Sequence, residues 1–238
     1  SWKLRFHTQT AGCSLTAQQP ENNIARTGFQ ALAGVLGGTQ SLHTNSMDET
    51  LALPSEKAAE IALRTQQIIA FETGVSNVVD PLGGSWYLEK LTDEIEEEAE
   101  SYFKEIENIG GVIPAIEQGY FQREIARSAS EYQEKVDKNK RIVVGVNDFV
   151  KDNEEIDIPI LEISSKSANN QIKSLEKLKN SRDELALQNS LNEVAIACKN
   201  NLNLVEPIIK AAKHYATIGE IVQKMKGEFG EWQESAVF

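Results

Sequence analysis

The first third of the chain switches twice between the hydrophobic period of a strand and that of a helix. Residues 2–10 alternate apolar and polar side chains, and residues 39–45 indicate a second strand. Each strand precedes a segment with apolar residues on one helical face, at 23–36 and at 55–73. This order predicts parallel strands with helices packed outside them, in a (β/α) barrel or an open doubly wound sheet. Two such units are too few to close a barrel.

The rest of the chain does not continue this alternation. Its expected elements are a turn-rich connector at 80–89, an acidic helix with one buried apolar face at 91–107, a loop and a helix within 110–136, an apolar strand buried on both sides at 141–150, a charged link at 151–159, and helices from 167 to the end. A capping box of Thr217 and Glu220 should divide the last helical run in two. We therefore expect three segments, at 1–80, 81–155 and 156–238.

The composition argues against several classes of protein. The net charge of −12 is unsuited to nucleic acid, because phosphate binding needs lysines and arginines gathered on one face. No apolar run approaches the ~20 residues of a membrane-spanning helix. Cys13 and Cys198 lie far apart and fit neither a disulfide framework nor a zinc site, which suggests reduced thiols and a cytoplasmic location.

Polar side chains gather where both predicted strands end. They are His7, Gln9 and Thr10 ahead of Gly12, and His43, Thr44 and Asn45 ahead of Asp48 and Glu49. Because the carboxyl ends of adjacent parallel strands meet at the same edge, we expect these two clusters to lie together.

Several interpretations of these clusters stay open at this point. The side chains could simply cap loops, or His7 and His43 could bind a metal with Asp48 or Glu49. A third possibility is a hydrogen-bonding pocket for a large polar ligand. No nucleophile motif surrounds Cys13, which we interpret as a small packing residue.

Specific motifs in these segments resemble one known family. "FHTQTAG" at 6–12, "TQSLHTN" at 39–45, "LALP" at 51–54 and "DPLGGS" at 80–85 resemble the methylmalonyl-CoA mutase family, in the C-terminal part of its substrate-binding barrel. The resemblance is strong over residues 4–90 and looser beyond. It implies an α/β fold, the C-terminal part of a TIM (β/α)8 barrel (its last two βα units) followed by a largely helical C-terminal extension. It also implies adenosylcobalamin-dependent radical isomerisation of (R)-methylmalonyl-CoA to succinyl-CoA.

The resemblance also assigns roles to individual positions. Gly12 and Ala52 match residues that contact cobalamin, Gln9 one beside the adenosyl group, and Glu49, with Asn45 close by, the carboxylate that contacts the adenosyl ribose. His7 and Gln40 resemble residues on the acyl-CoA side. Ribose hydroxyls need such acceptors, and a glycine lets a corrin approach the backbone closely.

Two departures from the family pattern shape the remaining expectations. No DxHxxG cobalamin motif occurs, so the axial histidine is expected from a small cobalamin-binding subunit in a hetero-oligomer, and no protein-bound metal is expected. The chain lacks an initiator methionine and is already strand-like at Trp2, so we expect a fragment, inactive alone, whose main catalytic residues lie upstream. The alternatives are a mutase of isobutyryl-CoA, ethylmalonyl-CoA or 2-hydroxyisobutyryl-CoA, or a non-catalytic assembly piece.

Overall fold

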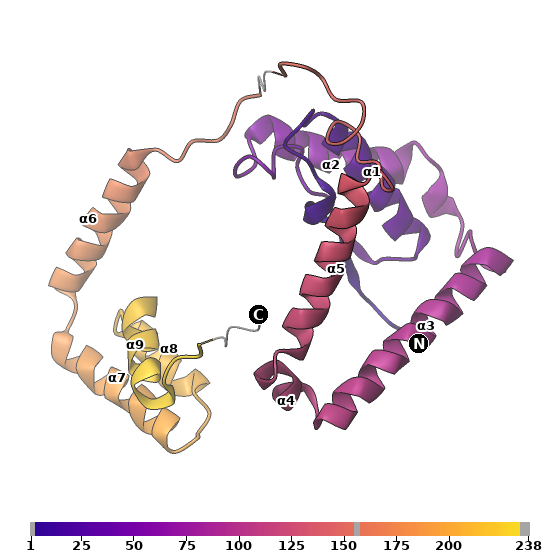
Figure 1. Cartoon of the computed structure of the whole chain (residues 1–238). Coiled ribbons are helices and arrows are strands. Elements are labelled where there is room, and N and C mark those ends of the chain that lie inside the picture. Colours follow the sequence, from indigo (N-terminus) through magenta and orange to yellow (C-terminus); the bar gives the residue numbers. More distant parts are fainter. Residues whose placement is uncertain (1–2, 155–157, 234–238) are drawn as a thin grey trace. The chain divides into compact units, whose positions relative to one another are not determined.

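The computed structural model describes residues 3–154 and 158–233 and divides into two compact units (Figure 1). The first unit runs to Leu161 and the second begins at Glu162. Among the described helices, none combines the length and the apolar character needed to cross a bilayer. The predicted division into three segments is not decided by this partition, and the predicted link at 151–159 lies partly outside the described residues.

The first unit begins with the predicted alternation of strands and helices. Its opening elements are β1 (His7–Gln9), the 3-10 helix η1 (Gly12–Ser14), α1 (Asn22–Leu36), β2 (Ser41–His43), α2 (Glu56–Phe71) and the 3-10 helix η2 (Val75–Asn77). The strands are parallel, with Thr8 opposite Leu42. This confirms an α/β arrangement, whereas the barrel remains a prediction.

Both strands are shorter than predicted, at three residues each. In the described residues each pairs with the other alone, so no second ladder extends them. The Gln40 N–H donates to the Phe6 carbonyl (3.2 Å) and the Thr10 N–H donates to the His43 carbonyl (3.1 Å), which closes the pair at both ends.

Helices α1 and α2 both carry small residues at positions where they pack against other parts of the unit. A Cβ atom added at Gly34 would lie 3.1 Å from Thr8 Cγ2, so a larger residue there would push α1 away from β1. Ala58 and Ala62 are the buried small residues of α2. The helix starts where predicted, because the Ser55 hydroxyl accepts the Ala58 N–H (3.3 Å).

The next helices differ in part from the prediction. They are α3 (Trp86–Ile109), α4 (Val112–Glu117) and α5 (Tyr120–Asp137). Helix α3 begins inside the expected connector, and its apolar face is not buried, since Ile95 is 58% and Phe103 57% exposed. The expected burial is wrong for the described residues, because helical period identifies an apolar face and not what covers it.

The predicted strand at 141–150 is also wrong. The segment is a loop with an isolated bridge between Val144 and Asp148, and Val146 and Val150 are exposed. Gly145 has φ of +83°, and the Asn147 side chain accepts the Val143 N–H (2.7 Å). Turn chemistry therefore overrides the β-branched run.

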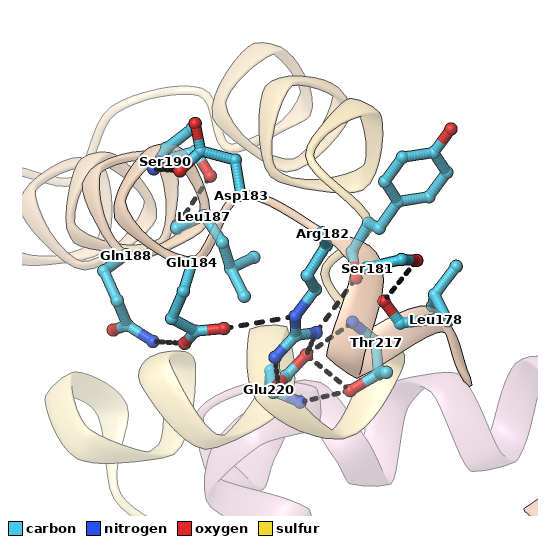
Figure 2. A network of polar contacts seen from close by, with 12 residues as sticks. Leu178, Ser181, Arg182, Asp183, Glu184, Leu187, Gln188, Ser190, Thr217 and Glu220 are labelled. Atoms are coloured by element: carbon cyan, nitrogen blue, oxygen red, sulfur yellow. Dashed lines mark hydrogen bonds and ion pairs between the residues drawn. The ribbon is translucent and has the colours of Figure 1, made fainter. Parts of the chain in front are cut away.

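The second unit is entirely helical in its described part. It contains α6 (Ser165–Ser181), α7 (Glu184–Lys199), α8 (Val205–Lys213) and α9 (Ile218–Phe229). Its core is formed by Leu187, Leu191, Val194, Cys198 and Ala211. The predicted capping box of Thr217 and Glu220 is confirmed at the start of α9 and lies beside Arg182 in Figure 2.

Candidate functional site

The two polar clusters meet at the carboxyl ends of β1 and β2, as predicted, except for His7, which begins β1 and lies at the opposite end of the strand pair. The Gln9 side-chain amide donates to Asn45 Oδ1 (3.3 Å). The Asn45 backbone N–H donates to the Thr10 hydroxyl (2.9 Å). These contacts join the loops after the strands into one site.

Gly12 lies directly against two side chains of the β2 loop. A Cβ atom at this position would be 3.0 Å from Glu49 Oε1 and 3.1 Å from Asn45 Nδ2. Such contacts are tighter than ordinary packing allows, so an alanine would displace one of the two groups. The sequence therefore places a glycine where a carboxylate and an amide approach the backbone, with Glu49 exposed and Asn45 buried.

Three buried polar atoms of the β2 loop have no hydrogen-bond partner among the described residues. They are Asn45 Nδ2, Ser46 Oγ and Asp48 Oδ1. Leaving a buried donor or acceptor unpaired costs about 1–3 kcal/mol, so natural proteins usually supply a partner. The site thus has hydrogen-bonding capacity available for a polar group from outside this part of the chain.

Asp48 shapes the loop that carries Glu49 and Ala52. Its carbonyl accepts the N–H groups of Leu51 (2.9 Å) and Ala52 (3.0 Å). Its carboxylate oxygen Oδ2 accepts the Ser55 N–H (2.9 Å) at the start of α2. The half-buried Ala52 therefore lies in the same loop as Glu49, held by backbone contacts.

His7 and Gln40 belong to the other end of the strand pair. His7 Nδ1 lies 2.7 Å from the Ser41 hydroxyl, in a hydrogen bond across the pair. Gln40 precedes β2, and its Oε1 accepts the Phe6 N–H (2.7 Å). The Gln40 contacts described here are to backbone, so the structure does not bring it together with Gln9, Asn45 and Glu49.

The metal-site interpretation finds no support in the geometry. Across residues 3–154 and 158–233, no group of three histidine, cysteine, aspartate or glutamate side chains could hold a metal ion. Cys13 is exposed in η1, so its interpretation as a packing residue is wrong, while Cys198 is buried in the second unit.

Sequence reasoning did not identify the polar residues of α1 that lie against the loops of the site. Asn23 and Thr27 are buried on α1, and Asn23 hydrogen bonds to the loops on both sides. A cavity of about 210 Å³ between β2 and α2, lined in part by Ser46, Glu49 and Gln66, was also missed. The available signal was the polar stripe of Asn23 and Thr27 on a helical face that also carries the buried Ala31.

Comparison with known proteins identifies a family and several proteins that are similar to this chain. The sequence model of the family described as methylmalonyl-CoA mutase matches residues 1–231. The 2-hydroxyisobutanoyl-CoA mutase large subunit of Aquincola tertiaricarbonis is 46% identical over 239 residues, which cover 100% of this chain and 42% of that protein. The methylmalonyl-CoA mutase of Rhizobium meliloti is 43% identical over 234 residues, which cover 98% of this chain and 33% of that protein.

A mitochondrial methylmalonyl-CoA mutase from Bos taurus is similar to the same extent. It is 43% identical over 230 residues, which cover 96% of this chain and 30% of that protein. The chain thus spans between 30% and 42% of the length of these relatives. Because the family's sequence model and these relatives cover almost all of its residues, the chain belongs to the methylmalonyl-CoA mutase family.

Proposed function

We propose that this chain is part of the large catalytic subunit of an adenosylcobalamin-dependent mutase that converts (R)-methylmalonyl-CoA to succinyl-CoA. Its two βα units would be the last two of a TIM barrel whose other units lie upstream, followed by the helical extension. The observation that carries the proposal is the approach of Gly12 to Glu49 and Asn45, at the positions that the family uses for its cofactor.

The residues present fit the adenosyl side of such a cofactor. Glu49 offers an exposed carboxylate that can accept hydrogen bonds from ribose hydroxyls, and Asn45 Nδ2 is a buried donor without a partner among the described residues. Gly12 leaves room where a side chain would block the loop. Gln9 and Ala52 complete the proposed set. When bound, adenosylcobalamin supplies hydrogen-abstracting radical chemistry.

The contribution of this chain is to orient the groups that would bind the cofactor. The Gln9 amide donates to Asn45 Oδ1, which fixes the Asn45 side chain so that its Nδ2 is directed to the Gly12 side. Asp48 fixes the loop that carries Glu49 through three backbone N–H groups. Preorganised donors and acceptors of this kind hold a reactive ligand without reorganisation during the reaction.

The remaining ligand and partner assignments complete the proposal. His7 and Gln40 would line the acyl-CoA side, although Gln40 would first have to release its contact with the Phe6 backbone. The axial histidine of the cobalamin would come from a small cobalamin-binding subunit, giving a hetero-oligomer. The term "large subunit" in the name of the Aquincola relative supports an assembly in which the large and small subunits are separate chains.

A second candidate substrate is 2-hydroxyisobutyryl-CoA. The observation in its favour is the 46% identity to the 2-hydroxyisobutanoyl-CoA mutase large subunit over the whole chain. The two candidates share the cofactor site, so turnover of each acyl-CoA by the complete assembly decides between them. Turnover of 2-hydroxyisobutyryl-CoA alone would reject methylmalonyl-CoA as the substrate.

The cofactor role is tested with Glu49→Ala in the complete mutase. We expect the dissociation constant for adenosylcobalamin to rise at least about tenfold, since a charge-assisted hydrogen bond contributes about 1.5–3 kcal/mol. Glu60→Ala is a matched control, because Glu60 is an exposed glutamate of α2 whose ion pair with Arg64 (3.1 Å) is itself exposed to solvent. Unchanged cofactor affinity and turnover in Glu49→Ala would remove Glu49 from the site.

A further inference from the structure

The side chain of Asn23 forms hydrogen bonds to two different loops and to Arg26 of its own helix. Its Nδ2 donates to the carbonyls of Thr16 (2.8 Å) and Met47 (2.9 Å). Its Oδ1 accepts the Thr16 N–H (3.0 Å) and the Arg26 guanidinium Nη1 (2.8 Å). Asn23 itself is 0% exposed, so its bond to Met47 is buried, whereas its bonds to Thr16 and Arg26 are partly buried.

Thr16 is the point at which the two loops are tied together. Both its N–H and its carbonyl bond to Asn23, and its hydroxyl accepts a hydrogen bond from Arg26 (2.9 Å). The Thr50 hydroxyl donates to the same Thr16 carbonyl (3.2 Å) from the second loop. The first loop therefore has direct and Asn23-mediated connections to the loop after β2.

These contacts are not those of an ordinary helix cap. Asn23 lies in the first turn of α1, where a capping side chain would accept N–H groups of its own helix. Its backbone partners instead belong to Thr16 and Met47, which are 7 and 24 residues away in the sequence. The hydrogen bonds of Asn23 therefore fix the spacing between two loops and do not cap the start of α1.

We infer that Asn23 is a positioning residue that sets the separation between Gly12 and Glu49. Gly12 and Thr16 lie in the same loop, and Glu49 lies between Met47 and Thr50. A shift between the two loops changes the position of the Glu49 carboxylate beside Gly12, where there is now no room for a Cβ atom. The inference rests on the proposed function, because it assigns to this separation a role in holding adenosylcobalamin.

The chain offers a matched control in Asn147. Its Nδ2 also donates to two backbone carbonyls, of Val136 and Arg141 (both 2.8 Å), and its Oδ1 accepts the Val143 N–H. It therefore holds a loop by the same chemistry. That loop accepts a hydrogen bond from Arg26 at the Val144 carbonyl (2.7 Å), but it carries no residue of the proposed site. Asn23→Asp and Asn147→Asp each replace two donors with an acceptor at unchanged size.

The experiment uses the complete mutase assembly with each variant and two readouts. Amide hydrogen exchange of the assembly without cofactor measures the loops at 12–16 and 47–52, and spectroscopic titration with adenosylcobalamin measures cofactor affinity. For Asn23→Asp we expect exchange in both loops to accelerate and the dissociation constant to rise about tenfold or more, because small misplacements of a site are costly. The KM for the acyl-CoA should stay within about twofold of the wild type.

Each outcome supports or overturns the inference. Asn147→Asp should accelerate exchange only near 141–148 and leave cofactor affinity unchanged. Equal losses of affinity in both variants, or an unchanged affinity in Asn23→Asp, would overturn the role of Asn23. A wild-type assembly that binds no adenosylcobalamin would refute the proposed function instead, and loop exchange would still report whether Asn23 joins the loops.

A second variant covers the case in which Asn23→Asp does not fold. Thr50→Val removes the exposed bond from Thr50 to the Thr16 carbonyl and keeps the shape of the side chain. A dissociation constant raised at least about twofold supports the positioning of the loops, because the variant loses this hydrogen bond and retains the packing of the side chain. An unchanged constant in a folded Thr50→Val protein overturns it.

Discussion

The ion pair between Arg182 and Glu220 should make the second unit sensitive to acid. Figure 2 shows the guanidinium of Arg182, which lies between α6 and α7, facing the carboxylate of Glu220 in α9. Two hydrogen bonds join them, at 2.9 Å and 2.6 Å, and the Arg182 side chain is only 5% exposed. The same carboxylate accepts the N–H of Thr217 (2.8 Å). Substitution of Glu220 by glutamine removes the charge while keeping the size.

The size of the stabilisation by this ion pair follows from the pKa of the Glu220 carboxyl group. Hydrogen bonding by Arg182, with further bonds from Thr217, lowers the pKa of Glu220 from 4.5 to about 2 against an opposing effect of burial. A shift of this size corresponds to about 3 kcal/mol at most. Glu220 is 25% exposed, so solvent screening reduces the expected contribution to roughly 1–2 kcal/mol.

The sign of the pH dependence is set by the direction of this shift. Because the pKa is lower in the folded state, the stabilisation is present above the ordinary value near 4.5 and is lost as the pH falls toward 2. We therefore expect Glu220→Gln to lower the free energy of unfolding by roughly 1–2 kcal/mol at pH 7. The difference from the wild type should nearly vanish near pH 2.

The measurement is urea unfolding at several pH values, followed by circular dichroism. Glu184→Gln is the matched control, since Glu184 contacts the same arginine (3.2 Å) but is 60% exposed. Glu184→Gln should lower the free energy of unfolding by less than about 0.5 kcal/mol, as for most exposed ion pairs. If Glu220→Gln costs the same at pH 2.5 and at pH 7, the charge-based reasoning is refuted.

Three further predictions concern the site and the core. Gly12→Ala should lower the stability of the chain by less than about 1 kcal/mol, because the exposed Glu49 can move, yet it should weaken adenosylcobalamin binding; circular dichroism and cofactor titration together test this. Leu187→Ala should cost about 2–5 kcal/mol in urea unfolding, because Leu187 is fully buried in the helical core, and a loss below 1 kcal/mol would contradict that burial. Residues 162–238 alone should unfold in one cooperative thermal transition, since they have their own core, and a gradual loss of helix would count against this.

Part of the site could be predicted because its chemistry follows from local rules. Parallel strands bring their carboxyl ends to one edge, so polar residues after both strands had to meet, as Gln9 and Asn45 do. The resemblance predicts that a corrin approaches the backbone at Gly12, and this stays a prediction, whereas the position of Glu49 and Asn45 beside that glycine is known only from the structure. The capping box of Thr217 and Glu220 was predicted correctly for a similar reason, because the Thr217 hydroxyl accepts an amide N–H only three residues away.

Other features depend on contacts that are distant in the sequence. The run at 141–150 has the composition of a strand, yet Gly145 and Asn147 bend it into a loop that the α1 side chain of Arg26 also contacts (2.7 Å to the Val144 carbonyl). Asn23 was missed for a similar reason. Its partners Thr16 and Met47 are recognised only after the loops are placed in space.

The two units bury different kinds of side chain, and this difference bears on function. The largest fully buried residues described in the first unit are Asn23, Thr27 and Asp48, all polar, whereas those of the second unit are Leu187 and Val194 with one polar residue, Ser190. Polar groups add little net stability when buried, but a bonded set such as that of Asn23 fixes geometry. Meanwhile Trp86 remains 92% exposed among the described residues. The first unit is therefore organised to position loops, and we expect it to gain its stability from apolar surface covered elsewhere in the complete subunit.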